Sequence, residues 1–211
     1  MMDKQMEDAE IISRVLSGEK QLYELIVRRF NPVLYRIGRT YGYNHEDTQD
    51  IMQESFVDAY RGLSGFRGDA SFKTWISRVM LNRCFQQVQK TRLQKELTVS
   101  INDNKEAMYT SSENETEKRM KQRELAFVLE DSMSKIPLDY RMVFILREVN
   151  GMDTAQTAAL LNITPSNVKV RLNRSKTMLR KEIEKSFDVA SIFEFNLRYC
   201  DGIVNEVMKK I

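Results

Sequence analysis

Four carboxylates recur at helical spacing in the segment 45–61, and their chemistry suits docking on another protein. At roughly 100° per residue they share an arc of about 80°; they are Asp47, Asp50, Glu54 and Asp58. Gln53 lies at the border of this arc, whereas the apolar residues of the segment lie on the opposite side and should be buried. The polar face of an ordinary solvated helix is the alternative interpretation.

Aromatic and basic residues alternate directly after this helix. Glycines at 62, 65 and 68 end it, and the two kinds of residue then follow: Phe66, Arg67, Phe72, Lys73, Trp75 and Arg78. Rings beside positive charge suit unstacked nucleic-acid bases, which offer a π-face and a phosphate chain. Phe72 and Trp75 also share helical spacing with Ile76 and Val79, so we expect most rings in the core and one or two at its rim.

These residues need a helical scaffold, and the flanking sequence predicts one. Apolar periodicity over 7–30 predicts two short helices separated by Gly18, and Pro32 is expected to start a third helix. Residues 1–97 should form one compact helical domain. The stretch 98–120 is polar, acidic and rich in Ser, Asn and Thr, which predicts a flexible linker.

A second helical domain is predicted at 121–185, and its last part has the pattern of a helix-turn-helix. Small and apolar residues at 155–161 indicate a short helix, and Asn162 tolerates a left-handed turn. Thr164 followed by Pro165 favours the start of a longer helix. A short helix, a tight turn and a longer basic helix are typical of a DNA-reading module. A basic helix in a purely structural hairpin is the alternative.

The longer helix carries seven basic and two acidic residues over 165–185. Clustered positive charge marks a phosphate-binding surface. Helical spacing places Val168, Leu172, Ser175 and Leu179 on the inward face. The outward face and its flanks hold Ser166, Lys169, Val170, Asn173, Arg174, Thr177, Arg180 and Lys181. The first half of this face is expected to meet base edges in the major groove, and its flanking cations to meet phosphates.

Composition limits the fold class and the chemistry. Eight glycines, three prolines and few alternating apolar runs favour an all-α protein, and the formal net charge of +3 says little by itself. His45 is the only histidine, and Cys84 and Cys200 lie far apart, so we expect no metal site, no cofactor and no disulfide. Both cysteines are expected to be small buried residues. No apolar run could span a bilayer, and we expect a cytoplasmic protein without direct membrane insertion.

The acidic helix, the aromatic loop and the basic helix together identify a family. The sequence resembles the small, two-domain extracytoplasmic-function sigma factors of bacterial RNA polymerase, within the sigma-70 family. The resemblance rests on QDIMQESF at 49–56, FRGDASFKTWISRVMLNR at 66–83 and VFILREVNGMDTAQTAALLNITPSNVKVRLNRSKTMLR at 143–180. It implies that 1–97 is sigma region 2 and 121–185 is sigma region 4. It also implies a non-enzymatic protein that directs core polymerase to promoters and promotes DNA melting.

The resemblance implies roles for individual residues. Asp50, Gln53 and Glu54 match positions that contact the largest polymerase subunit, and Asp47 joins them on the same face. The loop 63–71 and the next helix match the elements that melt and read the minus-ten element, with Asn82 at a position that holds a flipped base. The minus-ten candidates are Phe66, Arg67, Lys73, Trp75, Arg78, Asn82 and Arg83. The minus-thirty-five candidates are Ser166, Asn167, Lys169, Val170, Asn173 and Arg174.

The sequence also departs from the family pattern. Gln156 and Thr157 stand where the family usually has a Glu and an aliphatic residue. The extension 186–211 is apolar enough to need a partner, which is either the second domain or a regulator. The implied partners are core RNA polymerase, promoter DNA and an anti-sigma factor, with the free protein a monomer. A stand-alone helix-turn-helix regulator that binds DNA as a dimer is the alternative function, and an interaction protein without nucleic acid is a third.

Overall fold

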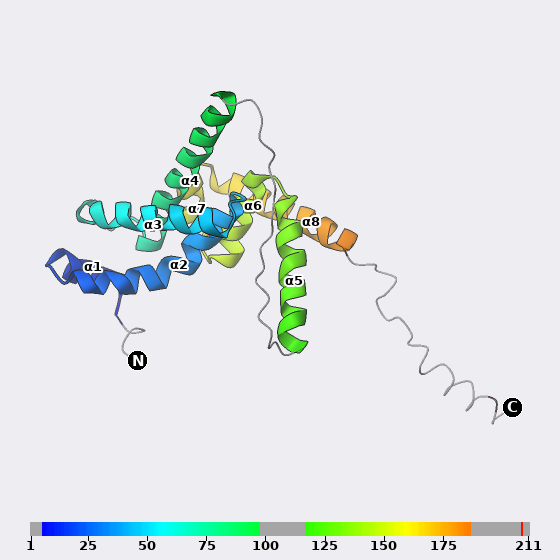
Figure 1. The fold of residues 1–211 in the computed structure, drawn as a ribbon, viewed down its shortest axis with the longest axis horizontal. Coiled ribbons are helices and arrows are strands. Elements are labelled where there is room, and N and C mark those ends of the chain that lie inside the picture. The colour runs from blue at the N-terminus through cyan, green and yellow to red at the C-terminus, as the bar shows by residue number, and fades with distance from the viewer. Residues whose placement is uncertain (1–5, 98–116, 187–207, 209–211) are drawn as a thin grey trace.

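Helices account for all the regular structure in the residues that the structure, a computed structural model, describes: 6–97, 117–186 and 208 (Figure 1). The first domain contains α1 (Asp8–Leu16), the 3₁₀ turn η1 (Lys20–Leu22), α2 (Tyr23–Thr40), α3 (His45–Arg61), the 3₁₀ turn η2 (Leu63–Gly65) and α4 (Phe72–Leu97). The second contains α5 (Glu117–Ser134), α6 (Leu138–Phe144), the π-helical turn η3 (Ile145–Val149), α7 (Thr154–Leu161) and α8 (Pro165–Ser186). The all-α prediction is confirmed for this part of the chain.

The border between the predicted linker and the second domain differs from the helix bounds. α5 begins at Glu117, so the last four residues of the predicted linker 98–120 are helical. Residues 98–116 lie outside the described residues. The predictions for the extension 186–211, and for Cys200 within it, also lie outside them, except at Ser186 and Met208.

Pro32 lies inside α2, and the prediction that a new helix starts there is wrong. A proline removes one backbone hydrogen bond from a helix interior and is unfavourable there. The two halves of α2 nevertheless present one continuous buried face, with Ile26 and Phe30 before the proline and Leu34 and Ile37 after it. Packing of this face against α3 and α4 outweighs the local cost.

Helices α2 and α3 approach closely at Gly38. A Cβ atom at this position would lie 2.7 Å from Thr48 Cγ2 and 3.0 Å from Met80 Cε. Thr48 is fully buried, and its hydroxyl donates to the carbonyl of Asn44 at 2.6 Å. The missing side chain at Gly38 therefore allows α2, α3 and α4 to share one core.

The helix-turn-helix forms as predicted from α7 and α8. Asn162 adopts the left-handed conformation, with φ 53° and ψ 46°. Thr164 Oγ1 accepts a hydrogen bond from the backbone N–H of Asn167 at 3.2 Å, and Pro165 is the first residue of α8. A proline is well placed there because the first N–H of a helix has no intrahelical acceptor. α8 packs on α5, α6 and α7 and ends on the side of the molecule opposite to α1 (Figure 1).

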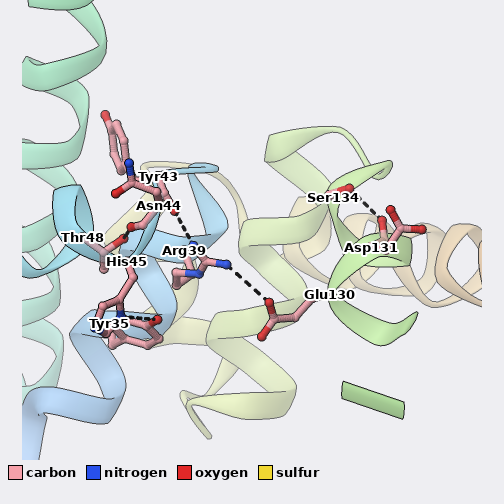
Figure 2. Close-up of polar contacts among 9 residues, drawn as sticks. All are labelled: Tyr35, Arg39, Tyr43, Asn44, His45, Thr48, Glu130, Asp131 and Ser134. Atoms are coloured by element: carbon pink, nitrogen blue, oxygen red, sulfur yellow. Dashed lines mark hydrogen bonds and ion pairs between the residues drawn. The ribbon is translucent and has the colours of Figure 1, made fainter. Parts of the chain in front are cut away.

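The two domains also pack against each other. Met142, Leu146 and Met152 of the second domain belong to the same buried cluster as the core of the first. At the edge of this contact, Arg39 Nη2 of α2 lies 3.4 Å from Glu130 Oε2 of α5 (Figure 2). The sequence predicts the two domains but gives no sign of this interface.

Candidate functional site

The acidic face of α3 points to solvent. All four residues predicted to dock on polymerase are exposed: Asp47, Asp50, Gln53 and Glu54. The opposite face is buried at Ile51, Met52, Phe56 and Ala59. Asn44 starts the helix, because its side-chain oxygen accepts from the backbone N–H of Asp47 at 2.7 Å. The first-turn carboxylates lie at the positive end of the helix dipole, which favours them.

Arg83 of α4 is held by two carboxylates of α3. Its Nε donates to Asp58 Oδ2, and its Nη1 lies 3.1 Å from Glu54 Oε2. The hydrogen bond from Arg83 lowers the pKa of Asp58, and the same bond raises the pKa of Arg83. Arg83 is a minus-ten candidate, but here its guanidinium joins α4 to the acidic face.

The aromatic residues after the acidic helix form one cluster of rings. Phe66 lies 5.3 Å from Phe72 and 5.4 Å from Trp75 between ring centroids, and Phe72 lies 5.4 Å from Phe30. Phe72 is buried, whereas Phe66 and Trp75 are half-buried at the rim. The cluster therefore fixes the loop 66–71 on the start of α4 and leaves two ring edges near solvent.

Two cations predicted to meet minus-ten DNA donate to the second domain. Lys73 Nζ donates to the carbonyl oxygen of Asn150, and Arg78 Nη2 donates to that of Ala159 at 2.9 Å. Of the other three polar candidates, Arg67 and Asn82 are exposed and Arg83 is half-buried. The structure thus brings the minus-ten candidates to one end of α4 and its preceding loop, but three of the four cations, Lys73, Arg78 and Arg83, are engaged within the chain.

The predicted DNA-reading face of α8 is open. All six minus-thirty-five candidates are exposed: Ser166, Asn167, Lys169, Val170, Asn173 and Arg174. Val168 and Ser175 on the inward face are fully buried. Away from the reading face, Arg171 pairs with Asp139 of α6 at 3.2 Å and Lys176 pairs with Glu148 of η3 at 3.0 Å. These pairs orient α8, while the reading face itself points outward.

Gln156 and Thr157, the two departures from the family pattern, both stabilise the start of α7. The Gln156 side chain accepts from the backbone N–H of Asp153 at 3.0 Å, and Asp153 Oδ1 accepts from the backbone N–H of Gln156 at 2.7 Å. This reciprocal arrangement is a capping box. The buried Thr157 hydroxyl donates to the carbonyl of Asp153 at 2.8 Å. Both residues therefore contribute to capping the first turn of α7.

Asn150 is the residue whose role the sequence does not reveal. Asn150 follows η3 directly and is the C-cap residue of that turn. Its side chain is only 3% exposed and reaches the first domain, where its Nδ2 donates to the carbonyl of Val33 at 3.4 Å. No local pattern in the sequence carries this information.

The described residues hold few groups for other chemistry. Within 6–97, 117–186 and 208, no three His, Cys, Asp or Glu side chains gather so that they could hold a metal ion. In the same residues, no helix is both long and apolar enough to cross a membrane. Cys84 is fully buried, and burial raises the pKa of its thiol to about 12, so the thiol stays protonated at neutral pH.

Two family models match the chain. The model described as Sigma-70 region 2 matches residues 26–94, and the model described as Sigma-70, region 4 matches residues 126–179. Curated relatives that match most of the chain are extracytoplasmic-function sigma factors. This chain belongs to that family. The stand-alone regulator is not favoured, because it leaves the region 2 match unexplained.

The sigma-factor relatives align over nearly their whole length. The extracytoplasmic-function sigma factor SigM of Mycobacterium tuberculosis is 25% identical over 174 residues, which cover 82% of this chain and 83% of SigM. The sigma-E factor of Haemophilus influenzae is 28% identical over 188 residues, covering 87% of this chain and 98% of the relative. Both alignments therefore extend over most of this chain.

Two solved structures share the fold. CnrH, solved in complex with the cytosolic domain of CnrY, matches with a TM-score of 0.63 and 22% identity over 85% of this chain and 99% of CnrH. The sigma factor RpoE of Bartonella quintana, solved with the anti-sigma factor NepR, matches with a TM-score of 0.64 and 15% identity over 77% of this chain and 96% of RpoE.

The family settles the class of function. A sigma factor binds core RNA polymerase and promoter DNA and gives transcription initiation its promoter specificity. It is not itself an enzyme. The surfaces of this chain are therefore binding surfaces, and the acidic face of α3 and the open face of α8 are the two that its described residues present most clearly.

Proposed function

We propose that this sigma factor docks on core RNA polymerase through the acidic face of α3. The observation that carries the proposal is the division of α3 into a buried apolar face and an exposed row formed by Asp47, Asp50, Gln53 and Glu54. Carboxylates held in a row on a rigid helix complement a basic partner surface. Arg83 supports this geometry because it links the end of the row to α4.

The same proposal assigns the promoter contacts to two other surfaces. Residues 1–97 act as region 2, in which the loop before α4 and the first half of α4 contact the minus-ten element. The second domain, joined to it through 98–120, acts as region 4 and places the exposed face of α8 in the major groove at the minus-thirty-five element. Lys169, Val170, Asn173 and Arg174 are well placed for base edges and nearby phosphates.

Charge reversal on α3 tests the docking surface. The double variant Asp50→Arg with Glu54→Arg replaces two exposed carboxylates with cations, so it should abolish co-purification with core polymerase. The helix should remain folded, since both side chains are exposed. The measurement is the amount of core enzyme retained by the tagged full chain, with circular dichroism as the check of folding.

A control with the same change of charge separates docking from general electrostatics. Glu10→Arg with Glu24→Arg alters two exposed carboxylates of α1 and α2 in the same domain. This control should retain core polymerase at the wild-type level. Equal retention by both double variants would disprove docking through α3.

We further propose that the free protein is a cytoplasmic monomer and that an anti-sigma factor controls it. Support comes from the Bartonella RpoE, a sigma factor of the same fold that was solved with the anti-sigma factor NepR, and from CnrH, which was solved with the cytosolic domain of CnrY. The chain purified from its own cells should contain a second protein in equal amount, and light scattering after its removal should give the mass of one chain. A dimer would instead favour the helix-turn-helix regulator.

A further inference from the structure

The contact between the two domains is centred on Asn150. This side chain is 3% exposed. Its Nδ2 donates to the carbonyl of Val33 at 3.4 Å, and its Oδ1 accepts from Arg36 Nη1 at 3.3 Å. Its backbone carbonyl accepts from Lys73 Nζ. One residue of the second domain therefore bonds α2 twice and α4 once.

A second polar contact lies on α7. Arg78 Nη2 of α4 donates to the carbonyl of Ala159 at 2.9 Å. Ala159 is among the last four residues of α7, whose carbonyls lack intrahelical partners and carry the negative end of the helix dipole. Arg78 thus satisfies an acceptor that would otherwise face water.

Apolar packing accompanies these bonds. Met142, Leu146 and Met152 share a buried cluster with the core of the first domain, and Met152 is only 1% exposed. Leu160 joins the same cluster from α7, one residue after the carbonyl that Arg78 contacts. The domains are therefore held by buried apolar surface as well as by hydrogen bonds, which distinguishes the contact from a few surface ion pairs.

The cations in this contact are the ones that the proposed function assigns to DNA. Lys73 and Arg78 are minus-ten candidates, and each directs its N–H donors at a carbonyl of the second domain. A phosphate that approached either cation would share its N–H donors with that carbonyl. The minus-ten surface and the second domain therefore compete for the same two side chains.

We propose that the second domain is an intramolecular competitor of promoter DNA for the minus-ten surface. In the closed state the two domains are packed together, and Asn150 is the latch that holds them so. The proposal rests on the proposed function for its assignment of Lys73 and Arg78 to DNA. The closed state lowers the apparent affinity for single-stranded DNA by the fraction of molecules that are open. Binding to polymerase at α3 leaves Asn150 untouched, so the latch and the dock are separate devices.

The latch can be broken without touching any residue assigned to DNA or polymerase. Asn150→Ala removes two side-chain hydrogen bonds, and Arg36→Ala removes one of them from the opposite domain. Losing such bonds should shift the open–closed equilibrium by about tenfold. Arg28→Ala is the matched control, because Arg28 lies on the same helix as Arg36, is exposed, and pairs only locally with Glu24 at 2.5 Å.

Two readouts on the full chain separate the possible failures. Small-angle X-ray scattering should give a larger radius of gyration for the Asn150→Ala and Arg36→Ala variants than for wild type and Arg28→Ala, with unchanged helicity by circular dichroism. A fluorescent mixed-sequence single-stranded DNA at low salt should bind the two opened variants about tenfold more tightly. Adding Lys73→Ala and Arg78→Ala to an opened variant should remove that gain.

Each outcome decides one point. An unchanged radius in both variants overturns the latch, and it leaves the polymerase dock untouched because co-purification tests that separately. An increased radius without a gain in DNA affinity overturns the competition. If, in addition, holoenzyme carrying Lys73→Ala and Arg78→Ala melts promoters like wild type, the assignment of these two residues to DNA fails as well.

Discussion

At the scale of single residues, charged side chains at the predicted sites serve two purposes. Arg83 lies among the minus-ten candidates, yet its guanidinium binds Asp58 and Glu54 of the acidic helix. Glu54 is itself a docking candidate, so Arg83 sets the direction of a carboxylate that the partner is proposed to contact. Charges inside a binding surface thus also hold it in shape.

The pair formed by Arg83 and Asp58 predicts a pH-dependent loss of stability in Arg83→Ala. The folded pKa of Asp58 lies below its ordinary value near 3.8, so the pair stabilises the fold above that pH and stops doing so as the pH falls through the folded pKa. At pH 7 the variant should lose about 0.5–1 kcal/mol, which is typical of a partly exposed pair. Urea unfolding of both proteins across a pH series measures this difference.

The difference between Arg83→Ala and wild type should shrink toward zero at acid pH. Arg28→Ala serves as a comparison, since Arg28 forms only an exposed pair on its own helix. A loss in Arg83→Ala that stays constant down to the lowest pH at which the protein folds would assign the effect to lost packing by the arginine stem.

At the scale of elements, the position of α3, the proposed docking helix, depends on its close approach to α2. Gly38 of α2 faces Thr48 at the start of α3, two residues before Asp50. The buried hydroxyl of Thr48 and the cap at Asn44 fix the first turn of α3. The position of the acidic row therefore depends on a residue of another helix that has no side chain.

Gly38→Ala should destabilise the first domain, although alanine favours helices more than glycine does. The added Cβ would lie 2.7 Å from Thr48 Cγ2, and overpacking of this kind costs about 1–3 kcal/mol. Thr48→Ser removes the clashing methyl group and should restore part of the loss. Thermal unfolding measures the effect, and Gly65→Ala, which meets nothing within 4 Å, should change little.

At the scale of the whole molecule, the two surfaces that we propose for DNA contact differ in their internal contacts. The face of α8 is exposed, whereas Lys73 and Arg78 are engaged with the second domain. The closed molecule therefore presents its duplex-reading surface before its single-strand-reading surface.

Lys169→Ala with Arg174→Ala should weaken duplex binding by the holoenzyme and relax its preference for the upstream element. A lost base-specific pair costs about 1–3 kcal/mol. Two lost cations should also reduce the slope of log K against log salt by about 2. Lys135→Ala with Lys185→Ala makes the same change of charge away from the reading face, so an equal effect in both would indicate non-specific electrostatics.

Local rules predict those parts of this fold that depend on neighbours in sequence. Helical spacing assigns the buried and exposed faces of α3, and Thr164 with Pro165 places the start of α8. The same rules fail at Pro32, where tertiary packing continues a helix that local preference would end. These rules do not predict the contacts of Asn150, because its partners lie in the other domain and no sequence periodicity relates them to it. The exposure of the candidate residues on α3 and α8 was therefore predictable, but the internal partners of Lys73, Arg78 and Arg83 were not.

The latch residue also imposes an order in time. Asn150 follows Lys73 by 77 positions in the chain. At synthesis rates of about 5–20 residues per second, a ribosome needs about 4–15 s to travel that distance. During this interval the first domain of every nascent chain lacks the carbonyls of Asn150 and Ala159 that Lys73 and Arg78 contact in the folded protein. The nascent sigma factor is therefore briefly more open than the completed chain.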